Sequence, residues 1–346
     1  MIKAGIVGVS GYGGIELFHI LSSHPDVKIT AIKSKSYNGN KLSEIYPHLA
    51  GSKLECRDYS ADELAENCDV VFTAVPHGEA SFEYVEKIKK YDKKIIDLSA
   101  DFRIHEKEVY EKWYKVKHPL PELLKEAVYG LPELHREKIK SAWLVANPGC
   151  YTTCSILASA PLLKEDFVDT DSIIIDAKSG TSGAGRKLKE NLHFSEMDES
   201  FYAYNIAGTH RHTPEIEQEL SLISGKDIVI SFSPHLLPVV RGILATTYIN
   251  VKKEIDEKNV LEIFKNFYNT HPFVRVLEDH LPNIKYVSGT NFLDIAVKYD
   301  ARAKRIIIIS ALDNLIKGAG GQAVQNMNLM FGLPEDRGLR LKPVYP

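Results

Sequence analysis

Cysteine is scarce in this chain, with four residues in a length of 346. They are Cys56, Cys68, Cys150 and Cys154, and no two of them form a C-x-x-C pair. This scarcity and spacing exclude a disulfide framework and a structural zinc site built on cysteine. Any chemistry at cysteine is therefore expected to be that of a single thiol.

The chain also lacks an excess of positive charge and any long apolar run. It has 43 Lys and Arg against 46 Asp and Glu, a formal net charge of -3, which argues against a dedicated nucleic-acid binder and favours a small-molecule partner. No uninterrupted apolar run approaches the roughly 18 residues of a membrane span. The opening MIKAG leaves no room for a signal-peptide core before the first glycines. We expect a cytoplasmic protein with no membrane partner.

The length and the 44% hydrophobic content predict a globular chain of about two domains. In the first part, short apolar runs alternate with helix-compatible stretches, a rhythm typical of a Rossmann-type, doubly wound parallel sheet. The expected strands cover residues 3–9, 27–32, 69–75 and 94–98. The segment 106–137 is rich in proline and charge and is expected to form helices and loops only.

From residue 172 the rhythm changes to longer strands with few helices between them, which predicts an α+β domain with a mixed, largely antiparallel sheet. The expected strands cover residues 172–177, 227–232, 244–251, 291–299 and 305–311, and the helices 214–223 and 256–268. A last periodic segment, 316–331, is expected to return to the first domain. We place the boundary in the turn Asn147-Pro148-Gly149-Cys150, so that the first domain covers 1–148 and about 315–346, and the second 149–314.

A glycine-rich turn follows the first expected strand and precedes a helix. It reads Gly8-Val9-Ser10-Gly11-Tyr12-Gly13-Gly14, which departs from the plain G-x-G-x-x-G fingerprint. Glycines allow a tight turn and a close approach of the backbone, and amides at a helix start bind a pyrophosphate. The turn therefore predicts dinucleotide binding through these residues, against the alternative of an ordinary tight turn.

The end of the second expected strand discriminates between the two nicotinamide cofactors. A protein that binds NAD usually has Asp or Glu there for the ribose 2′-hydroxyl. Here the chain reads Lys33-Ser34-Lys35, and cations and hydroxyls suit a 2′-phosphate. NADP is the predicted cofactor, with Ser34 and Lys35 as contacts, and a solvated basic loop is the alternative.

Cys150 follows the turn Asn147-Pro148-Gly149 and precedes a helix-compatible stretch. A thiol at a helix N-terminus gains thiolate character from the macrodipole, and the thiolate is the nucleophile. Cys150 is therefore a candidate nucleophile, against the alternative of a small buried hydrophobe. Cys154, one turn further on, is expected to pack inside the helix.

Two histidines precede the expected helix from residue 214. We expect Thr213 to be the N-cap and Pro214 the first helical residue. His210 and His212 then lie close to Glu215 at the helix start. The H-x-H spacing also suits a metal, but a third ligand of the usual type is lacking close by, although Glu215 or distant residues would serve. We expect acid/base chemistry beside a thiol and no metal.

Two further segments carry candidate ligand contacts. The stretch 98–103 follows an expected strand, where α/β sheets place ligand contacts, and its Arg103 is suited to a phosphate. The Gly/Ser-rich stretch 179–186, which begins with Ser179 and Gly180, offers backbone amides to an anion. The alternatives are a surface ion pair and a flexible loop.

Together these segments resemble the N-acetyl-gamma-glutamyl-phosphate reductase family of the arginine pathway, which is related to aspartate-semialdehyde dehydrogenases. The resemblance covers essentially the whole chain and rests on six motifs in the family's order. They are residues 8–14, 97–103, 147–151, 178–186, 210–216 and 313–323.

The resemblance implies the roles of the site residues. Cys150 is then the nucleophile of a thioester route and His212 its acid/base. Arg103 is the phosphate contact. The remaining substrate-site residues are His210, Glu215, Ser179 and Gly180, and those beside the nicotinamide are Asn314, Lys317 and Gly318.

The resemblance also implies the reaction, the cofactor and the assembly. The reaction is the NADPH-dependent reduction of N-acetyl-L-glutamyl 5-phosphate to the 5-semialdehyde and phosphate, in a homodimer or homotetramer. The rival substrates are aspartyl phosphate, disfavoured because Tyr151 stands where aspartyl enzymes usually have Asn after the cysteine, and a carrier-linked 2-aminoadipyl phosphate of lysine synthesis. A catalytically silent dinucleotide sensor is the alternative of another class, and the intact Cys150, His212 and Arg103 argue against it.

Overall fold

A computed structural model describes residues 1–345 and divides into two compact units. Unit 1 comprises Met1–Pro148 and Ala319–Arg340, and unit 2 comprises Gly149–Gly318 with the chain from residue 341. Across residues 1–345, no helix has both the length and the apolar character that a bilayer span requires.

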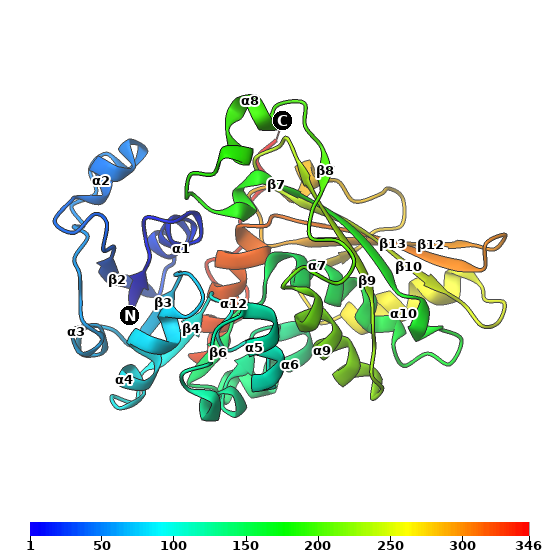
Figure 1. The fold of residues 1–346 in the computed structure, drawn as a ribbon, viewed down its shortest axis with the longest axis horizontal. Helices are drawn as coiled ribbons and strands as arrows, with labels where there is room; N and C mark the ends of the chain where they lie inside the picture. The colour runs from blue at the N-terminus through cyan, green and yellow to red at the C-terminus, as the bar shows by residue number, and fades with distance from the viewer. Residues whose placement is uncertain (346) are drawn as a thin grey trace. The chain divides into compact units, whose positions relative to one another are not determined.

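Unit 1 contains a six-stranded sheet in which every neighbouring pair is parallel. Its order is β2 (Val27–Lys33), β1 (Ile2–Val7), β3 (Val70–Thr73), β4 (Lys94–Asp97), β6 (Leu144–Ala146) and β5 (Val128–Tyr129). The order reverses beside β1, which is where ligands bind in doubly wound sheets. The Rossmann-type sheet predicted from the sequence is confirmed (Figure 1).

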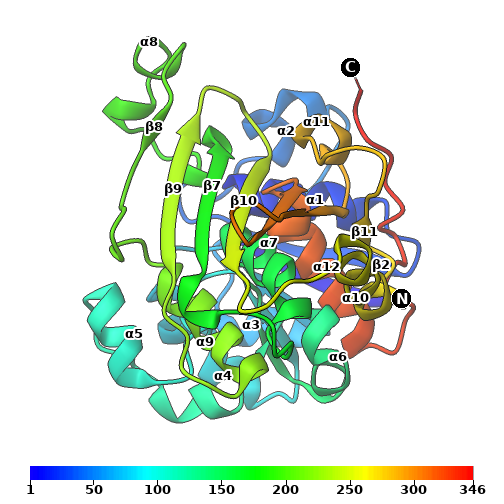
Figure 2. The same cartoon turned by 90° about the vertical axis from the view of Figure 1, so that its right-hand side faces the viewer.

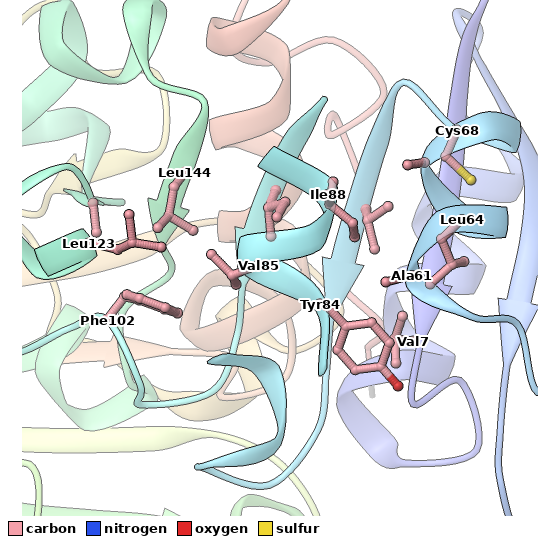
Figure 3. Close-up of a cluster of buried hydrophobic side chains, with 14 of the residues drawn as sticks. Val7, Ala61, Leu64, Cys68, Tyr84, Val85, Ile88, Phe102, Leu123 and Leu144 are labelled. Carbon is pink, nitrogen blue, oxygen red and sulfur yellow. The ribbon is translucent and has the colours of Figure 1, made fainter. Parts of the chain in front are cut away.

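Helices pack on this sheet because its strands are apolar on both faces. The helix α12 (Gly321–Met330) contacts α1 (Tyr12–Ser22), α6 (Pro132–Ser141) and β4. Val7, Leu64, Tyr84 and Ile88 belong to a buried cluster that joins the sheet to the remaining helices (Figure 3). Those helices are α3 (Ala61–Asn67) and α4 (Glu86–Lys89), while α2 (Leu42–Ile45) and α5 (Lys107–Tyr114) lie in connections.

The two strands β5 and β6 were not predicted, and the expectation that residues 106–137 hold only helices and loops is wrong at β5. The cause is their length. Val128–Tyr129 and Leu144–Ala146 are too short to show a period of two along the sequence. They form strands because β4 offers its edge to β6, and β6 in turn pairs with β5.

Unit 2 contains a seven-stranded mixed sheet, as the sequence predicted. The pairs β7–β9 and β11–β12 are parallel and the other four are antiparallel. The order is β11 (Val274–Val276), β12 (Leu293–Asp300), β13 (Arg305–Leu312), β10 (Ile243–Asn250), β7 (Ile174–Gly180), β9 (Ser231–Leu237) and β8 (Tyr202–Ala203). The short β8 and β11 were not predicted.

The strand predicted over residues 227–232 begins instead at Ser231. The preceding apolar residues Ile228 and Ile230 are buried, which mimics a strand in the sequence. Their backbone N–H groups, however, donate to the side chains of Ser221 and Glu217 rather than to a neighbouring strand. Side chains of a helix therefore accept the hydrogen bonds that a neighbouring strand would accept in a sheet.

One face of the second sheet is covered by helices. The helix α7 (Cys150–Ser159) lies against β10 and β13 and contacts α9 (Thr213–Ser224), while α10 (Glu257–Tyr268) contacts β11 and β12 (Figure 2). The short helices α8 (Phe194–Met197) and α11 (Ile284–Val287) lie in connections. Along β10 every second residue is buried and the alternate ones are partly exposed, so the described residues cover the other face of this strand only in part.

Candidate active site

Cys150 is the first residue of α7, and Gly149 is its N-cap. It is partly exposed, whereas the other three cysteines are buried. Burial raises the pKa of Cys56 to about 11 and that of Cys154 to about 12, and it also raises the pKa of Cys68. Those three thiols therefore stay protonated, and the position of Cys150 at a helix N-terminus favours its thiolate.

A buried carboxylate holds the turn in which Cys150 lies. Glu215, in the first turn of α9, is fully buried, and its Oε1 accepts the backbone N–H of Gly149 at 3.0 Å and the hydroxyl of Thr152 at 2.9 Å. The Thr152 hydroxyl also lies 2.6 Å from the Gly149 carbonyl. The starts of α7 and α9 are thereby linked on both sides of the cysteine. Thr152 was not predicted as a site residue, although it stands two positions after the candidate nucleophile.

Gly318 lies directly against Cys150. A Cβ placed on Gly318 would be 2.7 Å from the Cys150 Cβ, so no larger residue fits without movement of the backbone. The position belongs to a π-helical turn, Ile316–Gly320, and the Gly318 N–H donates to the Asp313 carbonyl at 2.9 Å. The structure thus brings Gly318 and Cys150 together, as a shared site requires.

The two histidines stand at the start of α9, but the helix begins one residue earlier than predicted. His212 is the N-cap and Thr213 the first residue. The reason is local, because the backbone of His212 is already near helical values and His210 accepts its N–H. Tyr151, next to Cys150 in the chain, has its ring 5.6 Å from that of His210 and 6.0 Å from that of His212.

A second tyrosine, Tyr204, belongs to the same aromatic group as Tyr151, His210 and His212. The Tyr204 hydroxyl donates to the Tyr151 hydroxyl at 3.3 Å, and the latter donates to the His235 carbonyl at 3.0 Å. Burial raises the pKa of Tyr204 to about 12 and raises that of Tyr151 as well. Both phenols stay neutral. No sequence signal marks Tyr204, which lies in an irregular segment far from the cysteine motif.

The predicted substrate loop lies at the end of β7. The Ser179 hydroxyl donates to the Gly180 carbonyl at 3.0 Å, and Ser179 also interacts with Tyr151. A Cβ on Gly180 would be 2.7 Å from the Val240 carbonyl oxygen, so glycine is required there. Ser179 and Gly180 thus belong to the same unit as Cys150, and Ser179 is linked to the aromatic group.

Asn314 and Lys317, predicted beside the nicotinamide, are both buried in unit 2. Asn314 Oδ1 accepts the N–H of Gly242 at 2.8 Å, and its Nδ2 donates to the Ser182 hydroxyl at 2.9 Å. The Lys317 ammonium lies 5.7 Å from the centroid of the Phe273 ring. These contacts fix the loops around the π-helical turn, and the cofactor roles of both residues stay predictions.

The glycine turn of unit 1 has the geometry of a phosphate cradle. Gly8 has φ +85°, and a Cβ there would be 2.2 Å from the Ala74 carbonyl oxygen. A Cβ on Gly14 would be 2.2 Å from the Gly8 oxygen, so α1 can lie this close to the turn because residue 14 is glycine. Around Gly13 nothing lies within 4 Å of an added Cβ, and around Gly11 only the Gly8 oxygen does. The start of α1 is open to a pyrophosphate, so the residues fit a bound dinucleotide.

The loop after β2 lies beside this turn, as a dinucleotide site requires. The Ser34 hydroxyl is 2.9 Å from that of Ser10. Lys35 is about half exposed and forms an ion pair with Glu83 at 2.5 Å, which raises the pKa of Lys35. Tyr12, the first residue of α1, is 37% exposed. The candidate cofactor residues of unit 1 are therefore neighbours, and Glu83 is a partner of Lys35 that the sequence did not indicate.

Arg103, the predicted phosphate contact, is buried in unit 1. Its Nε donates to the Asn147 carbonyl at 2.8 Å and its Nη2 to the Leu98 carbonyl at 2.7 Å. That edge of the guanidinium faces the main chain. The role of Arg103 toward phosphate stays a prediction.

The predicted site residues thus fall into two groups. Unit 1 holds the glycine turn, Ser34, Lys35 and Arg103, and unit 2 holds the candidate nucleophile, both histidines, Glu215, the substrate loop and the residues Asn314, Lys317 and Gly318. In the part of the chain that the structure describes, no three His, Cys, Asp or Glu side chains are grouped to hold a metal ion.

Two known families match successive segments of the chain. The family described as "Semialdehyde dehydrogenase, NAD binding domain" matches residues 3–142, and "Semialdehyde dehydrogenase, dimerisation domain" matches residues 150–314. An N-acetyl-gamma-glutamyl-phosphate reductase from Pelotomaculum thermopropionicum is 52% identical over 347 residues, which cover all of this chain and 99% of the relative. The chain belongs to the N-acetyl-gamma-glutamyl-phosphate reductase family.

Further relatives and solved structures extend this result. Reductases of the same name from Symbiobacterium thermophilum and Acetivibrio thermocellus are each 51% identical, covering 100% and 98% of this chain and 99% and 98% of the relatives. Aspartate semialdehyde dehydrogenase II from Vibrio cholerae matches with a TM-score of 0.72 at 16% identity, covering 96% of this chain and 99% of that one. An enzyme of that type with NADP from Candida albicans matches at 0.68 and 15%, covering 96% and 98%. These structures share the fold of the reductase family.

From the contact between Thr152 and Glu215 we predict how substitution of Thr152 changes the stability of the protein and the reactivity of Cys150. In Thr152→Val the buried Glu215 oxygen loses a donor at constant side-chain shape, which should destabilise the protein by about 1–3 kcal/mol. It should also slow alkylation of Cys150 by iodoacetamide, because the first turn of α7 loosens. Urea unfolding and mass-spectrometric alkylation rates measure the two effects.

Thr152→Ser is the matched control, since it keeps the hydroxyl and should behave like the wild type in both measurements. Equal stability and equal Cys150 reactivity in the valine and serine variants would show that the Thr152 hydroxyl does not hold the turn.

Proposed function

We propose that the protein catalyses the NADPH-dependent reduction of N-acetyl-L-glutamyl 5-phosphate to N-acetyl-L-glutamate 5-semialdehyde and phosphate, a step of arginine biosynthesis. The observation that carries the proposal is the partly exposed Cys150 at the first residue of α7, in a chain that full-length reductases of this name match at 52% identity. Unit 1 then binds the dinucleotide, and unit 2 carries catalysis and oligomerisation.

The first chemical step is formation of a thioester. The Cys150 thiolate attacks the acyl carbon of the substrate, a C–S bond forms, and the C–O bond to phosphate breaks. Arg103 supplies positive charge for the leaving phosphate. Ser179, Gly180 and Glu215 belong to the substrate side of the site.

The second step is reduction of the thioester. NADPH, when bound, would supply the hydride that reduces the thioester carbonyl carbon. His212 donates a proton to the resulting oxyanion of the thiohemiacetal, and in the reverse direction it accepts that proton. His212 takes the hydroxyl proton back as the C–S bond breaks, which releases the aldehyde and returns Cys150 as its thiolate, a good leaving group.

NADP, rather than NAD, is the cofactor in this proposal. Two features support it: the hydroxyl and cation of Ser34 and Lys35 after β2, where an acidic residue would suit NAD, and the fold shared with an enzyme from Candida albicans whose structure contains NADP. The glycine turn from Gly8 to Gly14 then receives the pyrophosphate. The nicotinamide is assigned to Asn314, Lys317 and Gly318.

A homodimer or homotetramer is the proposed assembly. The match to a dimerisation domain supports it, as does the half-exposed face of the second sheet, on which Ile174, Tyr248 and Ile307 are paired neighbours. We assign the enzyme to the cytoplasm, because none of the four cysteines forms a disulfide in the part of the chain that the structure describes, as expected in a reducing compartment.

The reverse reaction tests the proposed function. With N-acetyl-glutamate semialdehyde, NADP and phosphate, the wild type should form NADPH continuously, and it should not do so with aspartate semialdehyde. Cys150→Ser should lose turnover and still bind NADP, because an alkoxide at its ordinary pKa is a poor nucleophile and leaving group.

Absorbance at the NADPH band measures turnover, and fluorescence titration measures cofactor binding. Silence of the folded, NADP-binding wild type with both aldehydes would overturn the arginine-pathway assignment in favour of the carrier-linked aminoadipyl substrate. Substantial turnover by Cys150→Ser would refute the covalent route.

The ion pair between Lys35 and Glu83 makes a prediction about cofactor choice. If Lys35 exchanges Glu83 for the 2′-phosphate, Lys35→Glu should weaken NADP binding about tenfold or more and improve NAD relative to NADP. Glu83→Gln should keep or increase the NADP preference, because it removes the competing carboxylate. Isothermal titration with both dinucleotides checks this, and an unchanged preference in Lys35→Glu would remove Lys35 from the cofactor site.

A further inference from the structure

His210 is enclosed by aromatic rings rather than placed in an open pocket. It is 9% exposed. Its ring centroid lies 5.6 Å from Tyr151, 5.5 Å from Tyr204, 5.3 Å from Phe232 and 4.9 Å from His212. The interplanar angles lie between 68° and 88°, so these are edge-to-face contacts. The ring is therefore held in one orientation.

That orientation gives one ring nitrogen a defined partner. His210 Nδ1 accepts the backbone N–H of His212 at 3.1 Å. An acceptor nitrogen carries no proton, so the imidazole is neutral with its hydrogen on Nε2. The His210 carbonyl accepts the N–H of Thr213 at 2.9 Å. Two consecutive amides at the start of α9 are thus bonded to one residue.

The charges around His210 keep this acceptor available. Burial, followed by the neighbouring His212 and Arg211, lowers the pKa of His210 to about 3, and Glu215 acts weakly in the opposite sense. Tyr151 and Tyr204, the other titratable groups against the ring, have raised pKa values and are neutral. The hydrogen bond from His212 therefore persists through the range in which an ordinary histidine titrates.

The hydrogen bond to His210 Nδ1 comes from the backbone N–H of His212 itself. It therefore fixes the backbone of the candidate acid/base directly. His212 is the N-cap of α9, and the peptide that carries its N–H also sets the direction of its side chain. An acid/base group contributes only when it is held within hydrogen-bond reach of the reacting oxygen. A loosened peptide at His212 would reduce that contribution and leave substrate contacts elsewhere unchanged.

We propose that His210 is a positioning residue for the reduction, which holds the His212 peptide through its Nδ1 acceptor, and that it is neither an acid/base nor a substrate contact. This deepens the proposed function and revises the substrate role that the sequence resemblance gave to His210. Because the proposed role depends on the Nδ1 acceptor alone, two substitutions of His210 that differ in this acceptor should differ in activity.

The test compares His210→Phe with His210→Asn. Phenylalanine preserves the ring within the aromatic group and removes the acceptor, whereas asparagine provides Oδ1 close to the position of Nδ1. For the reverse reaction, His210→Phe should lower kcat about tenfold to a hundredfold, within the usual contribution of acid/base catalysis, with an unchanged KM for the aldehyde. It should also displace the pH profile of kcat. His210→Asn should retain most of kcat and the wild-type profile.

Three outcomes would overturn the proposal. They are wild-type kcat and pH profile in His210→Phe, a raised aldehyde KM at unchanged kcat in either variant, and equal losses in both variants. The last would indicate packing alone.

A readout independent of activity separates this proposal from the proposed function. Nitrogen-15 NMR of the imidazoles, with the signal of His210 assigned by its loss in His210→Asn, should show a neutral ring protonated at Nε2 from pH 5 to pH 8. Titration of His210 in that range would overturn the positioning role even if the enzyme proved active. Inactivity of the wild type with the acetylated aldehyde would instead count against the proposed function.

Discussion

The hydrogen bonds of the buried Glu215 carboxylate are the interactions on which the candidate site depends. A buried carboxylate is costly unless donors surround it. Here it lies in the first turn of α9 and accepts the N-cap amide of α7, so it is close to the positive ends of two helix dipoles. The same contact fixes Gly149, one residue before Cys150, while Thr152 fixes the following side of the turn. Cys150 at the start of α7 and His212 at the start of α9 thus stand on two helix N-termini that the hydrogen bonds of Glu215 link.

Within unit 1, the end of the segment that leads to Pro148 is also held by hydrogen bonds. Asn147, three residues before Cys150, is fully buried, and its N–H donates to the Asp97 carbonyl at 2.8 Å. Its carbonyl accepts Arg103, and its side chain bonds to Asn326 and to the Ala319 carbonyl. Backbone and side chain of Asn147 are therefore both held. Unit 1 therefore holds its chain up to Asn147, one residue before the unit ends at Pro148.

Much of the fold was predictable from the sequence, because its larger elements show strong local signals. The strand, glycine turn and helix around Gly8 combine an apolar run with residues that only a tight turn requires, and both sheets were predicted with their correct character. Strands of two or three residues, such as Val128–Tyr129, have no readable period and form only because a neighbouring edge is available. The predicted strand 227–232 was wrong at its start, because buried apolar residues such as Ile228 resemble a strand in the sequence even where their amides donate to side chains.

The candidate site was predictable where chemistry requires a residue type, and not where only the folded chain brings residues together. Cys150, His212 and the glycine turn stand out in the sequence through composition and spacing. Tyr204 and Glu83 have no such signal, because their partners Tyr151 and Lys35 lie 53 and 48 positions away. The misplaced cap at Thr213 shows the same limit, since the acceptor on His210 shifts the helix start by one residue.

The thioester on Cys150 is the central claim, and a burst experiment without phosphate tests it most directly. Oxidation of N-acetyl-glutamate semialdehyde by the enzyme with excess NADP should then stop after one NADPH per active site. Mass spectrometry should find one N-acetyl-glutamyl group on Cys150, which phosphate then releases. Continuous NADPH formation without phosphate and without hydrolysis of an adduct, or a modification on another residue, would contradict the account.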